Sequence, residues 1–360
     1  MTDTPPRAHK GRGAGLNPAG RFEPTRAVLD DDGWGSLDAW ADEPSPRTEV
    51  LPDRSRTVLT RNQSPDIGFD RSVNPYRGCE HGCVYCYARP SHGFLGLSTG
   101  LDFETKIFAK HDAAAQLRRE LATPAYRPEP IALGTNTDLY QPIERRLGIT
   151  RAILELALET RHPVTFTTKS ALVLRDLDLL RELARLELVS IAVTITTLQG
   201  ELARTLEPRA AAPHRRLAVI RALAAAGVPV GVSVAPIIPA LTDHEIEAIV
   251  AAGVEAGARH ASWVLLRLPY EIKDLFVAWL ETHAPLRAKR VLAQLRASRG
   301  GRLNDPEFGS RMRGSGAFAE LIAKRMRLAR RRCGIDDGHL RLRTDLFRRP
   351  SADARQMALL

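Results

Sequence analysis

Short apolar runs alternate with amphipathic segments from residue 130 onward, and this alternation restricts the folds open to the chain. Each run is dense in Val, Ile, Thr or Leu without strict polar alternation, which is typical of strands covered on both faces. Such strands, separated by helices, predict repeated β-α units and a parallel sheet. The runs are PIALGTNTD (130–138), PVTFTTKS (163–170), VSIAVTITT (189–197), PVGVSVAPII (229–238) and ASWVLLRLP (261–269).

A further strand is expected just before Cys79, which brings the pattern to about six β-α units. No GxGxxG follows any of these strands, so a Rossmann sheet is not indicated. We therefore expect an α/β fold, an open or partial (β/α)6 barrel. A helix over 213–227 should end at Gly227, a natural C-cap, and another should open at Thr242, with Glu245 at capping-box spacing.

The two ends of the chain differ in composition from the repeats. Residues 1–60 are rich in Pro, Gly, Asp and Arg and lack periodicity, which predicts a mostly disordered leader. Residues 61–275 hold the expected barrel. Residues 276–360 are expected to form a basic, helical C-terminal extension. Between Arg287 and Arg332 there are fourteen Lys or Arg residues against Asp305, Glu307 and Glu320.

The net charge of the chain is +10, which makes an anionic partner such as a nucleic acid plausible. A solvated basic helix face accounts for the same charge equally well. No run of about eighteen apolar residues occurs, and the first residues lack a hydrophobic signal segment, so we expect a cytoplasmic protein with no membrane contact. Its oligomeric state cannot be derived from these patterns.

Three of the four cysteines crowd into the string NPYRGCEHGCVYCYARP, residues 74–90. Cys79, Cys83 and Cys86 form CxxxCxxC, with Tyr85 directly before the last cysteine. Thiolates are soft ligands that suit iron-sulfur clusters and zinc. Most protein-bound clusters take four cysteines, so a loop with three leaves one iron open to another ligand.

Zinc is the competing interpretation of this loop. A structural zinc site would use the three cysteines with His81, His92 or the distant Cys333 as the fourth ligand. The aromatic residue at position 85, the β-α repeats that follow and the lack of a second CxxC favour the iron-sulfur cluster. Cys333 follows a run of arginines and is interpreted as a bystander.

With these features the chain resembles the radical SAM superfamily, and within it the spore photoproduct lyase-related proteins, often labelled DNA repair photolyase-like. The resemblance implies a [4Fe-4S] cluster whose open iron is chelated by S-adenosyl-L-methionine (SAM). It also implies that one electron from the cluster cleaves SAM into a 5'-deoxyadenosyl radical. The matching stretches are 74–92, 100–110, 132–144, 167–170, 207–216 and 234–243, with a further match at 301–314.

The same resemblance implies that the strand ends surround SAM. The loop after the second strand would contact the methionyl amino group, and Lys169 could neutralise its carboxylate. Tyr85 would lie beside the cofactor, and the remaining residues would line the cavity. The residues of the loop are Gly134, Thr135, Asn136, Thr137 and Asp138, and the other predicted contacts are Ser170, Thr194, Thr196, Ser233 and Pro236.

One departure from the family pattern bears on the substrate. Photoproduct lyases carry a hydrogen-donating cysteine in the second-strand loop, whereas this loop reads TNTD, so photoproduct repair by that route is in doubt. Tyr140 or Tyr270 could relay hydrogen instead. Three classes stay open: a lyase-like enzyme acting on DNA or RNA, a radical enzyme acting on a protein or small molecule, and a non-catalytic metal-binding module. An enzyme of this kind needs an electron donor such as flavodoxin or ferredoxin.

Overall fold

The computed structural model describes residues 9–22, 46–335 and 340–351. Its main sheet has the strand order β10-β9-β8-β7-β6-β3-β2, in which all neighbours are parallel except β2 (Leu59–Arg61) and β3. The parallel strands follow one another in chain order, so the expected partial (β/α)6 barrel is confirmed. These strands are β3 (Arg71–Val73), β6 (Ile131–Leu133), β7 (Val164–Thr168), β8 (Val189–Thr194), β9 (Val230–Ile237) and β10 (Ala261–Leu265).

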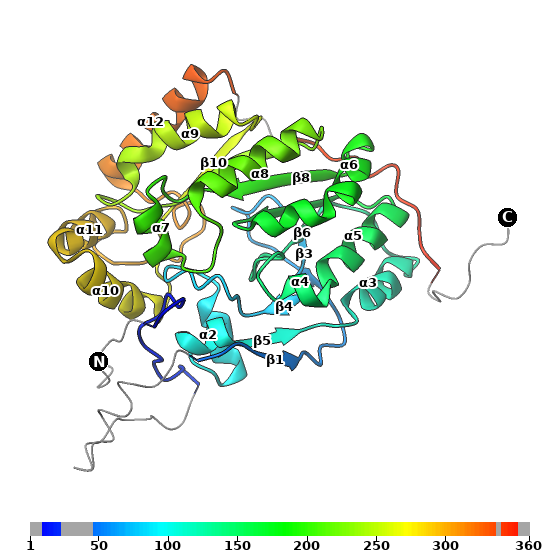
Figure 1. Ribbon diagram of the computed structural model, residues 1–360, viewed down its shortest axis with the longest axis horizontal. Coiled ribbons are helices and arrows are strands. Elements are labelled where there is room, and N and C mark those ends of the chain that lie inside the picture. The colour runs from blue at the N-terminus through cyan, green and yellow to red at the C-terminus, as the bar shows by residue number, and fades with distance from the viewer. Residues whose placement is uncertain (1–8, 23–45, 336–339, 352–360) are drawn as a thin grey trace, which may run out of the picture.

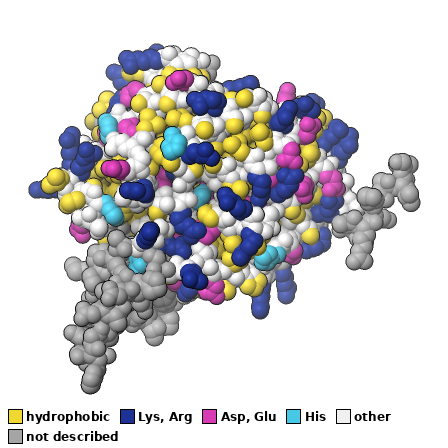
Figure 2. All heavy atoms as spheres, in the orientation of Figure 1, with side chains coloured by type: hydrophobic (Ala, Val, Ile, Leu, Met, Phe, Trp, Pro, Cys, Tyr) yellow, Lys and Arg dark blue, Asp and Glu magenta, His cyan; other side chains and the backbone are white. Residues whose placement is uncertain are grey.

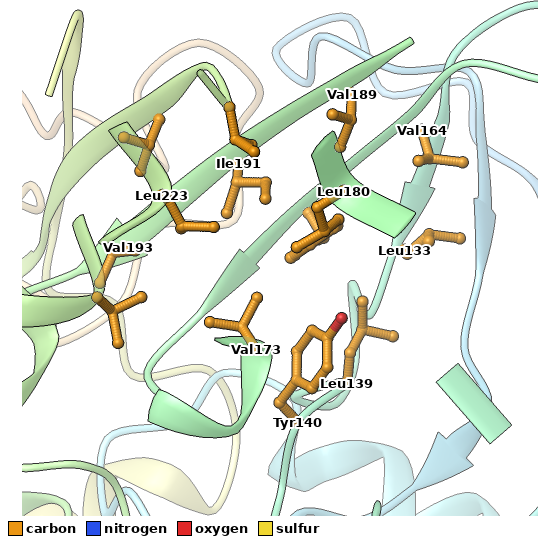
Figure 3. Close-up of a cluster of buried hydrophobic side chains, with 14 of the residues drawn as sticks. Leu133, Leu139, Tyr140, Val164, Val173, Leu180, Val189, Ile191, Val193 and Leu223 are labelled. Atoms are coloured by element: carbon orange, nitrogen blue, oxygen red, sulfur yellow. The ribbon is translucent and has the colours of Figure 1, made fainter. Parts of the chain in front are cut away.

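Helices cover the outer face of this sheet (Figure 1). The large apolar side chains of each strand point toward these helices. Val189, Ile191 and Val193 of β8, for example, are fully buried beside Leu180 and Leu223 of the helices (Figure 3). The main elements between the strands are α3 (Ala113–Ala122), α4 (Glu144–Leu147), α5 (Ile149–Glu159), η2 (Ala171–Asp176), α6 (Leu177–Arg185), α7 (Gly200–Leu206), α8 (Pro213–Ala225), η3 (Asp243–Glu245) and α9 (Ile246–Glu255).

The inner face of the sheet carries small and hydroxyl side chains, because side chains alternate along each strand. Thr165 pairs with Ser190, and Thr194 pairs with Ser233, which in turn pairs with Ser262. Closed (β/α)8 barrels fill this space with branched apolar side chains. Here short hydroxyl side chains take their place, and their oxygens can hydrogen-bond a polar ligand.

A second, three-stranded sheet supports the cysteine loop. It has the order β1-β5-β4, with β1 (Glu49–Pro52), β5 (Lys106–Ala109) and β4 (Tyr76–Arg77), and it lies beside η1 (Arg89–Leu95) and α2 (Leu101–Thr105). β1 and the first two residues of β2 fall within the predicted leader, as does the packed segment 9–22, in which Ala14 and Leu16 are buried. A disordered leader is therefore wrong for the described residues of 1–60. Their contacts are with distant parts of the chain, which local composition does not reveal.

The C-terminal extension is helical, as expected, in α10 (Ile272–His283), α11 (Pro285–Ala297) and α12 (Gly316–Arg332). Residues 340–351 depart from that expectation because they contain no helix. They cross the N-terminal ends of the strands instead, where the Phe347 ring lies 5.4 Å from that of His162 and 5.7 Å from that of Tyr126. No helix in the described ranges is both long and apolar enough to cross a membrane.

The two predicted helix boundaries have different outcomes. Gly227 has a φ of 78° directly after α8, as a C-cap glycine should. The predicted capping box at Thr242 is wrong: the Thr242 side chain accepts no N–H from the helix that follows, and its Oγ1 accepts the backbone N–H of Ile238 at 2.9 Å instead. Glu245 is buried and accepts from Thr197 and Leu198, because satisfying those donors in the β8 loop outweighs a reciprocal cap.

Candidate functional site

The cysteine loop lies at the C-terminal ends of the parallel strands, between β4 and η1. Cys79 and Cys83 are buried and Cys86 is half-buried, and all three are free thiols. Backbone bonds fix the loop to two other elements: the Cys79 N–H donates to Phe103 at 3.0 Å, and the Val84 N–H donates to Leu206 at 3.1 Å. Three soft donors on one rigid loop are a donor set that fits iron.

A fully buried ion pair holds the loop from behind. Arg89 donates through Nε to the Cys83 carbonyl at 2.9 Å and pairs with Glu104. The Glu104 carboxylate also accepts the backbone N–H groups of Gly13 at 3.0 Å and Ala14 at 2.9 Å. Residues 9–22, which we call the strap, are thereby joined to the cysteine loop through a single carboxylate.

The strap crosses the loop at close range. A Cβ on Gly13 would stand 1.7 Å from the carbonyl oxygen of Gly82. Gly82 itself has a φ of 68°, and a Cβ there would stand 2.8 Å from the Glu104 carboxylate. Gly13 is thus required by the close approach of two backbones, and Gly82 by its left-handed φ.

Burial favours the protonated form of two of the loop thiols, those of Cys79 and Cys83. It raises the pKa of Cys83 to about 12, although the nearby Lys169 ammonium opposes the shift. Burial likewise raises the pKa of Cys79 well above its usual value. Metal binding must therefore displace protons from these thiols, as is usual for thiolate ligands.

A charged network that the sequence did not reveal lies under Tyr85. The Tyr85 hydroxyl donates to Glu207, which also accepts from Thr196 Oγ1 at 2.6 Å and pairs with the buried Arg216. Burial alone would raise the pKa of Glu207, but Arg216 and Lys169 lower it to about 2. The only signal for Glu207 and Arg216 was their place in the matching stretch 207–216.

Lys169 lies next to the cysteine loop. Its Nζ lies 5.8 Å from the centroid of the Tyr85 ring and lowers the pKa of both Cys83 and Glu207. Ser170 caps the N-terminus of η2, because its Oγ accepts the Leu172 N–H at 3.1 Å. Lys169 is thus the predicted cation that stands beside the cysteine loop.

Asp138 is saturated by protein donors. Its oxygens accept from Tyr140 N–H, Thr168 Oγ1 and Lys169 N–H at 2.8–2.9 Å, and His81 Nδ1 lies 3.3 Å away. Burial opposes ionisation, yet His81 and these donors lower the pKa of Asp138 to about 2. Asp138 therefore links the ends of β6 and β7 to the residue between the first two cysteines.

The rest of the predicted loop mostly supports the same region. Thr137 Oγ1 donates to the Gly78 carbonyl at 2.7 Å, next to the first cysteine. Thr135 exchanges hydrogen bonds with Asn74, and its carbonyl accepts the Tyr87 hydroxyl at 2.5 Å. Gly134 has a φ of 70°, and Asn136 is exposed.

Predicted residues on β8 and β9 also meet. Thr194 and Ser233 are partners in register on the inner face, and both are buried. Thr196 Oγ1 reaches the Ala235 carbonyl at 3.0 Å, next to Pro236 near the end of β9. These two strand ends therefore form one wall beside Tyr85.

The alternative ligands and relays lie elsewhere. His92 Nε2 is bonded to the Lys106 carbonyl at 2.9 Å, and Cys333 packs against the outer core. Tyr140 is fully buried in that core (Figure 3), while the Tyr270 ring lies 3.7 Å from the Arg21 guanidinium of the strap. Within the described ranges, no three His, Cys, Asp or Glu side chains converge as around a single metal ion. A four-iron cluster needs no such convergence, because each thiolate binds a different iron.

The family model of the radical SAM superfamily matches residues 73–252, which is half of the chain. The chain therefore belongs to this superfamily. An uncharacterized protein of Mycobacterium tuberculosis is 39% identical over 221 residues, covering 61% of this chain and 65% of that protein. An uncharacterized protein of Methanocaldococcus jannaschii is 26% identical over 199 residues, covering 55% of this chain and 71% of that protein.

Solved structures of spore photoproduct lyase share the fold. One point mutant has a TM-score of 0.58 at 17% identity, covering 79% of this chain and 78% of that chain. A mutant with bound AdoMet and dinucleoside spore photoproduct has a TM-score of 0.56 at 16% identity, with the same coverage of 79% and 78%. This similarity confirms the predicted relationship at the level of the fold. It does not identify the substrate of this chain.

Proposed function

We propose that Cys79, Cys83 and Cys86 hold a [4Fe-4S] cluster and that the chain cleaves SAM reductively at the mouth of the barrel. The observation that supports this proposal most is the set of three free thiols on one buttressed loop, at the strand ends where barrel enzymes carry their sites. When bound, the cluster supplies one electron to the sulfonium of SAM, which breaks a C–S bond and yields methionine and a 5'-deoxyadenosyl radical.

The chain's own residues would bind and orient SAM. Lys169 offers an ammonium to the methionyl carboxylate, and the backbone at Gly134 permits close approach of the amino group. The hydroxyls of Thr194 and Ser233 on the inner face suit a ribose. Asp138 and Glu207 are better suited to positioning, since protein donors already occupy their oxygens.

The iron-sulfur assignment is favoured over structural zinc by where the candidate fourth ligands lie. His92 is engaged with a backbone carbonyl, His81 is engaged with Asp138, and Cys333 lies in a different core. A three-thiol loop leaves the open coordination position that SAM requires.

A nucleic acid is the substrate class we propose, with a lyase-like or modifying reaction. Spore photoproduct lyase, whose fold this chain shares, has been crystallised with a dinucleoside photoproduct. Lys and Arg side chains spread across the face shown in Figure 2 rather than only over the helical extension, and they suit a polyanion. The same charge would favour an acidic electron donor such as flavodoxin or ferredoxin.

Anaerobic reconstitution with iron and sulfide tests the assignment. The protein should gain visible thiolate-to-iron absorption and release 5'-deoxyadenosine from SAM after addition of dithionite. Cys83→Ala should abolish both readouts, whereas the matched control Cys333→Ala should leave both unchanged. Retention of the absorption and of SAM cleavage by Cys83→Ala would show that the ligands are assigned incorrectly.

A further inference from the structure

The segment 301–314 closes the open side of the barrel, a role that the proposed SAM chemistry does not use. Arg311 pairs with Asp66 of the β2–β3 connection at 2.6 Å, and the Leu265 N–H at the end of β10 donates to Met312 at 3.0 Å. Arg299 is buried beneath them and donates to four carbonyls, those of Leu265, Leu266, Ser310 and Arg311. The segment 301–314 thereby joins the two edges of the main sheet, and we call this set of contacts the seam.

Arg299 has carbonyl acceptors in place of a carboxylate, whereas among the described residues Arg267, also at the seam, donates to no protein oxygen. Arg267 follows β10, its Nε is buried without a hydrogen-bond partner, and its Nη1 reaches only the Met312 sulfur at 3.3 Å. Among the described residues none of the ion pairs includes Arg267, and the carboxylate of Asp66 is already taken by Arg311. Burial and the repulsion from Arg311 lower the pKa of Arg267.

This isolation is unusual near the site. Arg89 and Arg216 are also buried there, but each pairs with its own glutamate. A half-buried charge without a partner is costly, and each unsatisfied buried donor calls for an explanation. The simplest explanation is an anion supplied from outside the chain.

The position of Arg267 points to which anion. Its guanidinium carbon lies 5.7 Å from the centroid of the Tyr87 ring. Tyr87 directly follows the third cysteine, its hydroxyl bonds to the loop after β6, and 51% of its surface is exposed. An exposed aromatic ring beside an arginine is the combination that single-stranded nucleic acids use, with a base stacked on the ring and a phosphate on the cation.

We infer that Arg267 and Tyr87 form a binding site for one nucleotide unit of the substrate, in which Arg267 takes a backbone phosphate and Tyr87 stacks on the adjoining base. This site rests on the proposed function and deepens it, because it places a phosphodiester at the rim next to Cys86. Arg267 contributes affinity rather than base selection, since phosphate contacts carry no sequence information.

Fluorescence anisotropy of a labelled single-stranded DNA oligonucleotide, measured on anaerobically reconstituted protein at several salt concentrations, tests this site. Arg267→Gln should weaken binding about tenfold for every sequence and reduce the salt slope by about one phosphate contact. Tyr87→Leu should weaken binding by a similar factor, whereas Tyr87→Phe, which keeps the ring, should bind nearly as wild type. The matched control Arg181→Gln removes the same charge from an exposed position on α6 and should change little.

Each outcome is decisive when folding is checked by iron content and far-UV circular dichroism. Equal affinity of wild type and Arg267→Gln overturns the site while leaving the proposed nucleic-acid substrate intact. Absence of binding by wild-type protein overturns the site together with that substrate, but SAM cleavage would still stand. Competition by an acidic peptide that exceeds competition by an oligonucleotide of equal charge would assign Arg267 to a carboxylate instead.

Discussion

The two ends of the barrel are closed by different kinds of interaction. At the C-terminal ends of the strands, buried ion pairs hold the cysteine loop, namely Arg89 with Glu104 and Arg216 with Glu207. At the N-terminal ends, uncharged rings pack together, and Tyr126 and His162 share a hydrogen bond of 2.7 Å. Ion pairs fix geometry at a high desolvation cost, whereas packed rings add stability without demanding one arrangement. The comparison indicates that the contacts at the C-terminal ends of the strands fix the position of the cysteine loop. Those at the N-terminal ends mainly stabilise the fold.

Breaking the pair behind the cysteine loop should have the largest effect. Arg89→Met leaves Glu104 buried and uncompensated, which should cost about 3–5 kcal/mol of unfolding free energy in urea denaturation. Iron content after reconstitution should fall as well, because the Cys83 carbonyl loses its donor and Glu104, which holds the strap, loses its counter-ion.

The double variant Arg89→Met, Glu104→Met is the matched control for this prediction. It should recover much of the lost stability without recovering iron binding, since it removes both charges but restores no anchor. A double variant that binds iron as well as wild type would refute the positional role of the pair.

The base of the barrel should respond to pH. Burial lowers the pKa of His162 to about 4, below its ordinary value of 6.5. The unfolded chain therefore binds a proton at a higher pH than the folded chain does, so stability falls as pH drops from 6.5 toward 4 and this loss levels off below 4. The expected loss is about 3 kcal/mol.

His162→Gln should flatten that part of the pH profile, measured by chemical denaturation at each pH. Iron content at neutral pH should not change, because His162 is remote from the cysteine loop. A variant that keeps the full pH dependence would assign it to other groups.

The smallest effect is expected from the C-terminal segment. Phe347→Ala removes a half-buried ring from His162 and Tyr126, which should cost about 1–2 kcal/mol. The thermal midpoint should fall while iron binding and SAM cleavage persist. Loss of iron in Phe347→Ala would show that the two ends are coupled, contrary to the division drawn here.

The sequence predicted the barrel well because its strands are buried on both faces. The runs around Ile191 and Val232, for example, are apolar at positions that face the helices, and this periodicity is a local property. The cysteine loop could be predicted for the same reason, since its three cysteines lie within one short stretch of sequence.

What the sequence did not predict depends on distant partners. The strap is held by backbone N–H groups that bind Glu104, ninety or more positions away along the chain. Glu207 and Arg216 look like ordinary surface charges until the fold buries them against each other. Asp138 was expected to face a ligand, yet it accepts hydrogen bonds from two neighbouring strand ends, which only the three-dimensional arrangement reveals.

The tight crossing of Gly13 over Gly82 has a consequence for interpreting natural variation. The segment that defines the superfamily begins at residue 73, so a Gly13→Ala polymorphism would fall outside it and would be scored as harmless. Its added methyl group would nevertheless meet a carbonyl oxygen between the first two cysteines at 1.7 Å. A substitution that leaves all three cysteines intact should therefore impair binding of the proposed iron-sulfur cluster.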